Sequence, residues 1–118
     1  MTFRRSDIIQ TVCDFPNLFR NGQKSAVQLA KSLRLQARRA EITQPALAAF
    51  LKDHPEQIEL WLGWSDDKRT SPAWGLRRTD TGYLLFRYPD GPRTSYENGP
   101  EACAAFIEKE IDGLLSSL

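Results

Sequence analysis

A run of two acids and two bases, Asp66-Asp67-Lys68-Arg69, lies between the tryptophans of the chain, Trp61 and Trp64 before it and Trp74 after it. Carboxylates and cations flanked by indole rings have the chemistry to bind a charged ligand, to position a proton or to grip a partner protein. Two adjacent aspartates do not face each other across a sugar as the carboxylates of a glycosidase do. Three interpretations follow: a solvated turn with local ion pairs, a binding loop, or an enzyme site with Asp66 or Asp67 as base.

Histidine and cysteine, the other common catalytic and metal-binding residues, are scarce in this chain. His54, Cys13 and Cys103 form neither a C-x-x-C nor an H-E-x-x-H motif. Both cysteines lie in segments with helical apolar spacing, which predicts buried, protonated thiols rather than a disulfide or a Cys-His nucleophile. Nucleotide-binding glycine motifs and the G-x-S-x-G motif of hydrolases are also missing from the sequence. We therefore expect no metal, no cofactor and no enzymatic activity.

The length and composition are those of an ordinary globular domain. With 118 residues, 41% hydrophobic and 26% charged, the chain is predicted to form a single domain over residues 1–118. No continuous apolar segment suggests a signal peptide or a membrane span, and two scattered cysteines favour a cytoplasmic protein. The net charge is +1, yet residues 1–54 carry nine Lys/Arg against four Asp/Glu. This basic half predicts either internal ion pairing, which we favour, or an acidic partner.

The N-terminal half shows the patterns of about four short helices. Residues 5–14 have apolar side chains at helical spacing, and a proline within residues 15–19 predicts an apolar loop after this helix. Residues 24–39 predict a second helix with a basic stripe. Thr43 is a candidate N-cap for a third. Residues 55–64 fit a fourth helix, although their alternation also fits a strand.

The next part of the chain has the two-residue period of β-strands. Residues 74–78 and 84–88 alternate in hydrophobicity and predict a β-hairpin. Gly82 suits the left-handed position of a three-residue loop. This loop gives a register that pairs Thr79 with Tyr83, and likewise Arg77 with Leu85 and Gly75 with Arg87.

A third strand and a final helix complete the expected fold. Residues 94–96 follow a second tight turn and predict a short edge strand. Asn98 then caps a helix with a long apolar face and an acidic outer face. The predicted class is α+β, with an N-terminal group of about four short helices, a three-stranded antiparallel β-meander and a C-terminal helix packed on the sheet.

These elements suggest a surface for a protein partner. Periodicity predicts that Trp61 and Trp74 are buried and leaves Trp64 available outside. The expected register brings Arg77, Tyr83 and Arg87 together on the outer sheet face. We therefore predict a non-enzymatic cytosolic interaction module, accessory, inhibitor-like or immunity-like in kind. Its predicted partner-binding residues are Trp64, Asp66, Asp67, Lys68, Arg69, Arg77, Tyr83 and Arg87.

The alternative is a nucleic-acid-binding protein. Residues 29–51 resemble the two helices of a helix-turn-helix, although the residues between the helices exceed the usual turn of about three or four. The reading helix would also carry no arginine or lysine before Lys52. A basic and aromatic sheet face is a second possible surface for a single strand. The basic residues predicted to contact phosphates in the helical version are Lys31, Arg34, Arg38 and Arg39.

Overall fold

The computed structural model describes residues 5–67 and 73–117, with only the backbone for residues 5–7. Its helices and strands follow the order expected of an α+β protein. In sequence they are α1 (Arg5–Cys13), α2 (Phe15–Asn21), α3 (Ala26–Ser32), the 3₁₀ turn η1 (Arg39–Glu41), α4 (Gln44–Asp53), α5 (Glu56–Asp67), β1 (Ala73–Thr79), β2 (Gly82–Tyr88), β3 (Arg93–Tyr96) and α6 (Gly99–Leu115). The sheet has the order β1-β2-β3 and is antiparallel throughout, so the predicted meander is confirmed.

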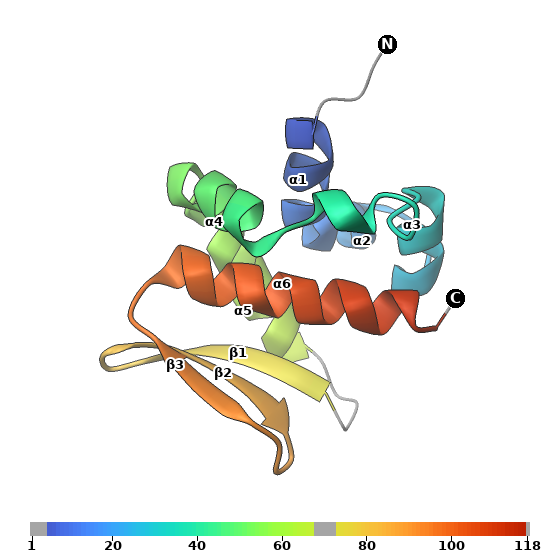
Figure 1. The fold of residues 1–118 in the computed structure, drawn as a ribbon. Coiled ribbons are helices and arrows are strands. Elements are labelled where there is room, and N and C mark those ends of the chain that lie inside the picture. Colours follow the sequence, from blue (N-terminus) through green and yellow to red (C-terminus); the bar gives the residue numbers. More distant parts are fainter. Residues whose placement is uncertain (1–4, 68–72, 118) are drawn as a thin grey trace.

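Helix α6 forms the middle layer of the molecule. It packs on β1 and β2 on one side and on α3 and α4 on the other (Figure 1). This position explains why six consecutive residues, 102–107, are all buried, since a helix between two layers has little polar surface. The prediction that the last helix covers the sheet is confirmed.

Two helix starts read from the sequence are confirmed in atomic detail. Thr43 Oγ1 accepts a hydrogen bond from the Ala46 amide at 3.3 Å, and Asn98 Oδ1 accepts one from the Glu101 amide at 3.1 Å. A proline in the first turn of α4 and of α6 removes an amide that has no partner within the helix. Both helices therefore begin where side-chain chemistry fixes them.

Replacing Asn98 with alanine should lower the free energy of unfolding by about 1 kcal/mol, because the first turn of α6 loses its cap. Urea unfolding followed by circular dichroism measures the change. Asn98→Ser keeps an acceptor at the same place and should remain close to the wild type. Equal losses in the two variants would show that the side-chain cap does not stabilise α6.

The apolar loop predicted for residues 15–19 is wrong, because these residues belong to α2. Pro16 lies in the first turn of this helix, where its missing amide hydrogen costs nothing. Phe15 and Pro16 are buried. The helix therefore contributes Phe15 to the hydrophobic core.

The basic-striped helix predicted for residues 24–39 is wrong beyond Ser32. The Arg34 amide donates to the Lys31 carbonyl at 3.0 Å, and the Leu35 amide donates to the Ala30 carbonyl at 3.2 Å. These two bonds form a Schellman motif that ends α3. Arg34 has φ of 57°, a left-handed conformation usually taken by glycine, which costs a non-glycine residue about 1 kcal/mol. Since an arginine gives no sequence signal for this motif, the early helix end was not predicted.

Residues 56–64 are helical, so the helix predicted for residues 55–64 is confirmed to within one residue at its start, but it runs further than expected. Helix α5 continues to Asp67, so Asp66 and Asp67 lie in its last turn rather than in a loop. Ser65 Oγ accepts a hydrogen bond from the Leu76 amide of β1 at 2.8 Å. This bond fixes the end of α5 against the first strand of the sheet.

The predicted hairpin register is wrong by one residue. Thr79 pairs with Gly82 across a two-residue turn, and Leu76 pairs with Leu85. Both leucines are buried, at 1% and 4% exposed, and face the helices. Because a shift of one residue moves every side chain of a strand to the opposite face, burial of this leucine pair selects the observed register.

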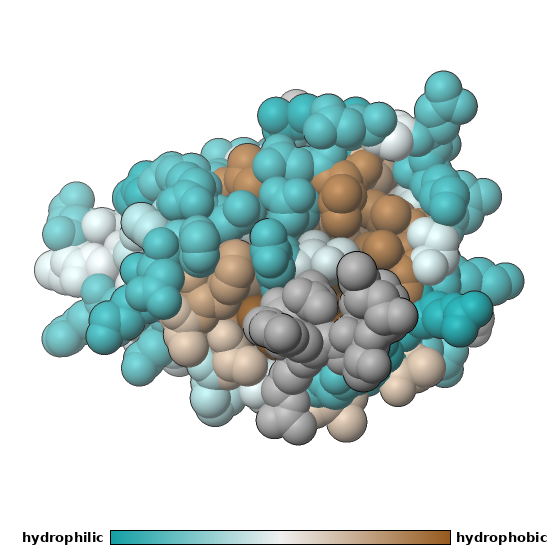
Figure 2. Space-filling model, turned by 90° about the horizontal axis from the view of Figure 1, so that it is seen from above, coloured by the Kyte–Doolittle hydropathy of each residue, from teal (hydrophilic) through white to brown (hydrophobic). Residues whose placement is uncertain are grey.

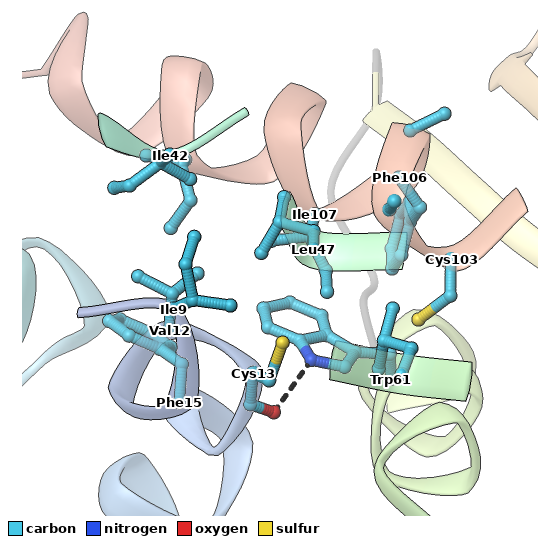
Figure 3. Packing of buried hydrophobic residues seen from close by; sticks show 14 of the residues in the cluster. Ile9, Val12, Cys13, Phe15, Ile42, Leu47, Trp61, Cys103, Phe106 and Ile107 are labelled. Atoms are coloured by element: carbon cyan, nitrogen blue, oxygen red, sulfur yellow. Dashed lines mark hydrogen bonds between the residues drawn. The ribbon is translucent and has the colours of Figure 1, made fainter. Parts of the chain in front are cut away.

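The core is built around Trp61 of α5 (Figure 3). Its side chain is fully buried, and its indole N–H donates to the Cys13 carbonyl at 2.9 Å. Phe15 lies 6.5 Å from the indole, centroid to centroid, and Phe106 of α6 lies 6.0 Å away at 87°. Trp61 therefore joins α1, α2, α5 and α6, and its predicted burial is confirmed.

The two cysteines, Cys13 and Cys103, are free and buried, as predicted. Among the helices of the described residues, none combines the length and the apolar character that crossing a membrane requires.

Candidate functional site

Trp64, predicted to lie outside, is half-buried among the helices. Its indole N–H donates to Glu110 Oε1 at 2.7 Å, and Glu110 is only 9% exposed. The rings of Phe15 and Phe19 meet Trp64 edge-on at 5.7 and 5.3 Å. The residue thus ties α5 to α6 and α2, and only part of its ring borders an apolar groove of about 340 Å³ next to Phe19.

The charged run between the tryptophans is only partly described. Asp66 and Asp67 are exposed in the last turn of α5, at the negative end of the helix dipole, while Lys68 and Arg69 lie outside the described residues. No group of three or more His, Cys, Asp or Glu side chains within 5–67 and 73–117 is arranged to hold a metal ion. A role for these four residues in binding stays a prediction.

The inner face of the sheet holds two residues that were predicted for the outer face. Arg87 pairs with Trp74, and its guanidinium lies 5.6 Å from the centre of the indole ring, which is half-buried. Tyr83 pairs with Arg78, whose guanidinium lies 5.8 Å from the phenol ring and also forms an ion pair with Glu59 of α5. The corrected register therefore separates Tyr83 and Arg87 from Arg77.

The ion pair at the edge of this inner face affects the acid involved. The hydrogen bond from Arg78 lowers the pKa of the Glu59 carboxyl below its usual value. Both side chains are exposed, so water screens the interaction. It orients Arg78 along α5 rather than towards the open side of the sheet.

The outer face of the sheet presents a different set of side chains. The Phe86 ring lies directly over Gly75, where a Cβ atom would come within 2.5 Å of the ring. The Arg77 guanidinium lies 5.4 Å from the centre of this ring. Tyr88, next along β2 on the same side, is 57% exposed. We call this surface the aromatic–arginine face, and it consists of Arg77, Leu84, Phe86, Tyr88 and Arg93.

The aromatic–arginine face is basic and uncovered. Its described strand positions include no acidic residue. Neither Arg77 nor Arg93 forms an ion pair with another residue of the described chain. The helices of the described chain all lie on the opposite side of the sheet (Figure 1). Sequence reasoning found Arg77 but missed Leu84, Phe86 and Tyr88; the alternation around the buried Leu85 was the signal for them.

The basic residues of the helical layer divide into paired and unpaired sets. Arg39 binds Glu108 and Asp112 of α6, each at 2.6 Å, and Arg38 binds Glu41 at 2.9 Å. Arg39 therefore partly compensates the negative charge of these two carboxylates, and the hydrogen bond that it donates to Asp112 is the main cause that raises the pKa of Arg39.

Lys31 and Arg34, by contrast, are exposed. Residues 33–43 separate α3 from α4, so the two helices do not form the compact turn of a helix-turn-helix. Of the four cations predicted to contact phosphates, Arg38 and Arg39 instead form ion pairs with carboxylates of the protein itself.

Comparison of the chain with protein-family models, curated proteins and solved structures found no match. Functional inference therefore rests on the chemistry of the described surfaces. Among these, the aromatic–arginine face combines an exposed tyrosine with two exposed arginines that form no ion pair within the described residues.

Proposed function

We propose that the protein is a non-enzymatic interaction module that binds an acidic surface of another cytosolic protein through its aromatic–arginine face. The observation that carries this proposal is the side of the sheet left uncovered by the described helices, where two arginines flank large apolar side chains without a carboxylate. Tyrosine, phenylalanine and arginine are among the residues enriched in protein interfaces.

The geometry of this face suits binding without large reorganisation. Phe86 is backed by the Gly75 backbone and flanked by Arg77, so its ring is already held in one orientation. Side chains on a paired strand lose less conformational entropy on binding than side chains on a free loop. Arg77 and Arg93 can each hold a carboxylate through two parallel hydrogen bonds. The favoured partner surface therefore carries carboxylates around an apolar centre that accepts Tyr88.

An accessory, inhibitor-like or immunity-like role agrees with this chemistry, because such proteins act by covering a surface of their partner. Lys68 and Arg69 lie outside the described residues and stay candidate partner-binding residues on sequence grounds, since they precede β1 in the chain. Asp66 and Asp67 carry the opposite charge and would meet cations at the edge of an interface.

Nucleic acid is the less favoured ligand for the same face. Single-stranded binding needs several open rings on which bases stack, and among the aromatic side chains of this face only Tyr88 is widely exposed. Fluorescence anisotropy with labelled single-stranded DNA and RNA at low salt tests this alternative. Binding that weakens steeply with salt and is lost in Arg77→Glu/Arg93→Glu would replace the protein partner by a nucleic acid.

Charge reversal on the sheet tests the proposed function. Tagged wild-type protein is used to capture partners from its native cells, and the dissociation constant is then measured with the purified partner. Arg77→Glu/Arg93→Glu should weaken binding at least about tenfold, because each reversal places like charges across the interface. Tyr88→Ala should weaken it about tenfold through loss of an exposed aromatic anchor.

The matched control is Lys24→Glu/Lys52→Glu, which reverses two exposed charges on the helical side. This variant should keep the wild-type affinity, and reversing the contacting acids of the partner should restore binding to the sheet variant. Full affinity in Arg77→Glu/Arg93→Glu would show that the partner binds elsewhere.

A further inference from the structure

A hollow of about 630 Å³ lies between α1 and the segment that joins α3 to η1. Its apolar walls come from Ile8, Leu33 and Ala37. The volume is within the usual range of small-molecule sites, about 300–1,000 Å³. Figure 2 shows the helical side of the molecule, where hydrophobic patches lie among hydrophilic side chains.

The charged residues at this hollow are not equivalent. Arg38 is held by Glu41 through two hydrogen bonds of 2.9 and 3.0 Å, so its charge is compensated within the protein. Arg34 is exposed and forms no ion pair with a described residue. Lys31 and Arg34 also line a second hollow of about 390 Å³ alongside the first. The rim of the apolar hollow therefore carries excess positive charge.

The backbone of Arg34 gives an independent reason to assign its side chain a role. It is the only non-glycine residue of the described chain with positive φ, at 57°. Glycine occupies the same position of a Schellman motif without strain. An arginine there makes the fold less stable than it could be, and residues held in strained conformations concentrate at functional sites.

We propose that this hollow binds an amphipathic anion, a small carboxylate that carries an acyl chain or an aromatic ring. The apolar part lies against Ile8, Leu33 and Ala37, and the carboxylate is bound by Arg34. Apolar walls disfavour a nucleic-acid backbone, which is charged along its whole length. The site lies among the helices on the side of α6 that faces away from the sheet (Figure 1). It is therefore separate from the aromatic–arginine face, and its assignment does not rest on the proposed function.

Octanoate is a suitable probe. Its binding is measured by the NMR chemical shifts of the backbone amides in the ¹⁵N-labelled full chain. Saturable shifts at Thr11, Ser32 and Ala37, which line or adjoin the walls, are expected with octanoate. Acetate lacks the apolar part and 1-octanol lacks the charge, so each should bind at least about tenfold more weakly. Octylammonium, with the opposite charge, should not compete with octanoate. Equal binding of octanoate and octylammonium would overturn the proposal.

Arg34→Gly separates binding from folding. Since glycine relieves the left-handed strain, this variant should unfold at a higher urea concentration than the wild type while binding octanoate at least about tenfold more weakly. Arg34→Lys keeps a cation and should retain most of the affinity, and Lys52→Ala removes a distant cation and should leave the affinity unchanged. Wild-type octanoate affinity in Arg34→Gly, or weakened affinity in Lys52→Ala, would contradict the assignment.

Discussion

Replacing Trp61 with alanine should lower the free energy of unfolding by about 3–5 kcal/mol, the range for removing a large buried aromatic side chain. The side chain is fully buried and contacts Phe15 and Phe106 from two other helices. Alanine would also leave the Cys13 carbonyl without its indole donor. A domain of this size is stable by only about 5–15 kcal/mol, so urea unfolding should show a large shift of the midpoint.

Two further variants serve as comparisons for the loss of stability in Trp61→Ala. Trp61→Phe keeps much of the apolar volume but loses the N–H donor, so it should cost clearly less than Trp61→Ala. Trp74→Ala removes a half-buried indole from the inner sheet face and should also cost less. If Trp61→Ala unfolded at the wild-type urea concentration, the helices would not depend on Trp61 for their packing.

Local chemistry was enough to predict most helix starts and the order of the elements. Thr43 and Asn98 act as caps because each side chain reaches an amide only three residues away. Such contacts depend on neighbouring residues alone and need no knowledge of the fold. The same holds for the alternation that predicted the two strands of the hairpin and for the turn residues that predicted the third strand.

The wrong predictions of the hairpin register and of the end of α3 each arise at one position whose residue type is compatible with two backbone conformations. Gly82 fits both a two-residue and a three-residue hairpin, and the choice depends on which register buries Leu76 with Leu85. The end of α3 depends on Arg34 adopting the conformation of a glycine. Neither outcome is set by residue type alone.

The candidate surfaces required contacts between residues far apart in the sequence. Trp64 was expected to lie outside, whereas its indole N–H donates a hydrogen bond to Glu110. This bond could not be foreseen from local spacing, because the two residues are 46 positions apart in the sequence. Arg39 was expected to be available to phosphates, whereas it binds Asp112, 73 residues away. Spacing along one helix cannot reveal such partners. The alternation around Leu85 indicated the apolar residues of the aromatic–arginine face, but only the observed register shows that they share this face with Arg77 and Arg93.

The stability of the protein should fall as the pH rises above 9, and the Cys13 thiol should be a main cause. Burial, with a smaller effect of Asp14, raises the pKa of Cys13 from its usual 9.0 to about 12, and burial also raises the pKa of Cys103. Between these values the unfolded chain releases the thiol proton and the folded chain keeps it. The stabilisation is therefore complete below pH 9 and is lost as the pH rises towards 12. The loss from Cys13 should reach about 3 kcal/mol at pH 11.

Comparison of wild type with Cys13→Ala isolates this contribution, because tyrosines and lysines titrate alike in both proteins. Urea unfolding from pH 8 to 11 should show a shallower decline in Cys13→Ala, even though the cavity lowers its stability at every pH. A disulfide reagent at pH 8 should modify Cys13 far more slowly in the native protein than in urea, since the thiol is buried and protonated. Parallel declines of the two proteins would mean that Cys13 ionises alike in the folded and unfolded chains.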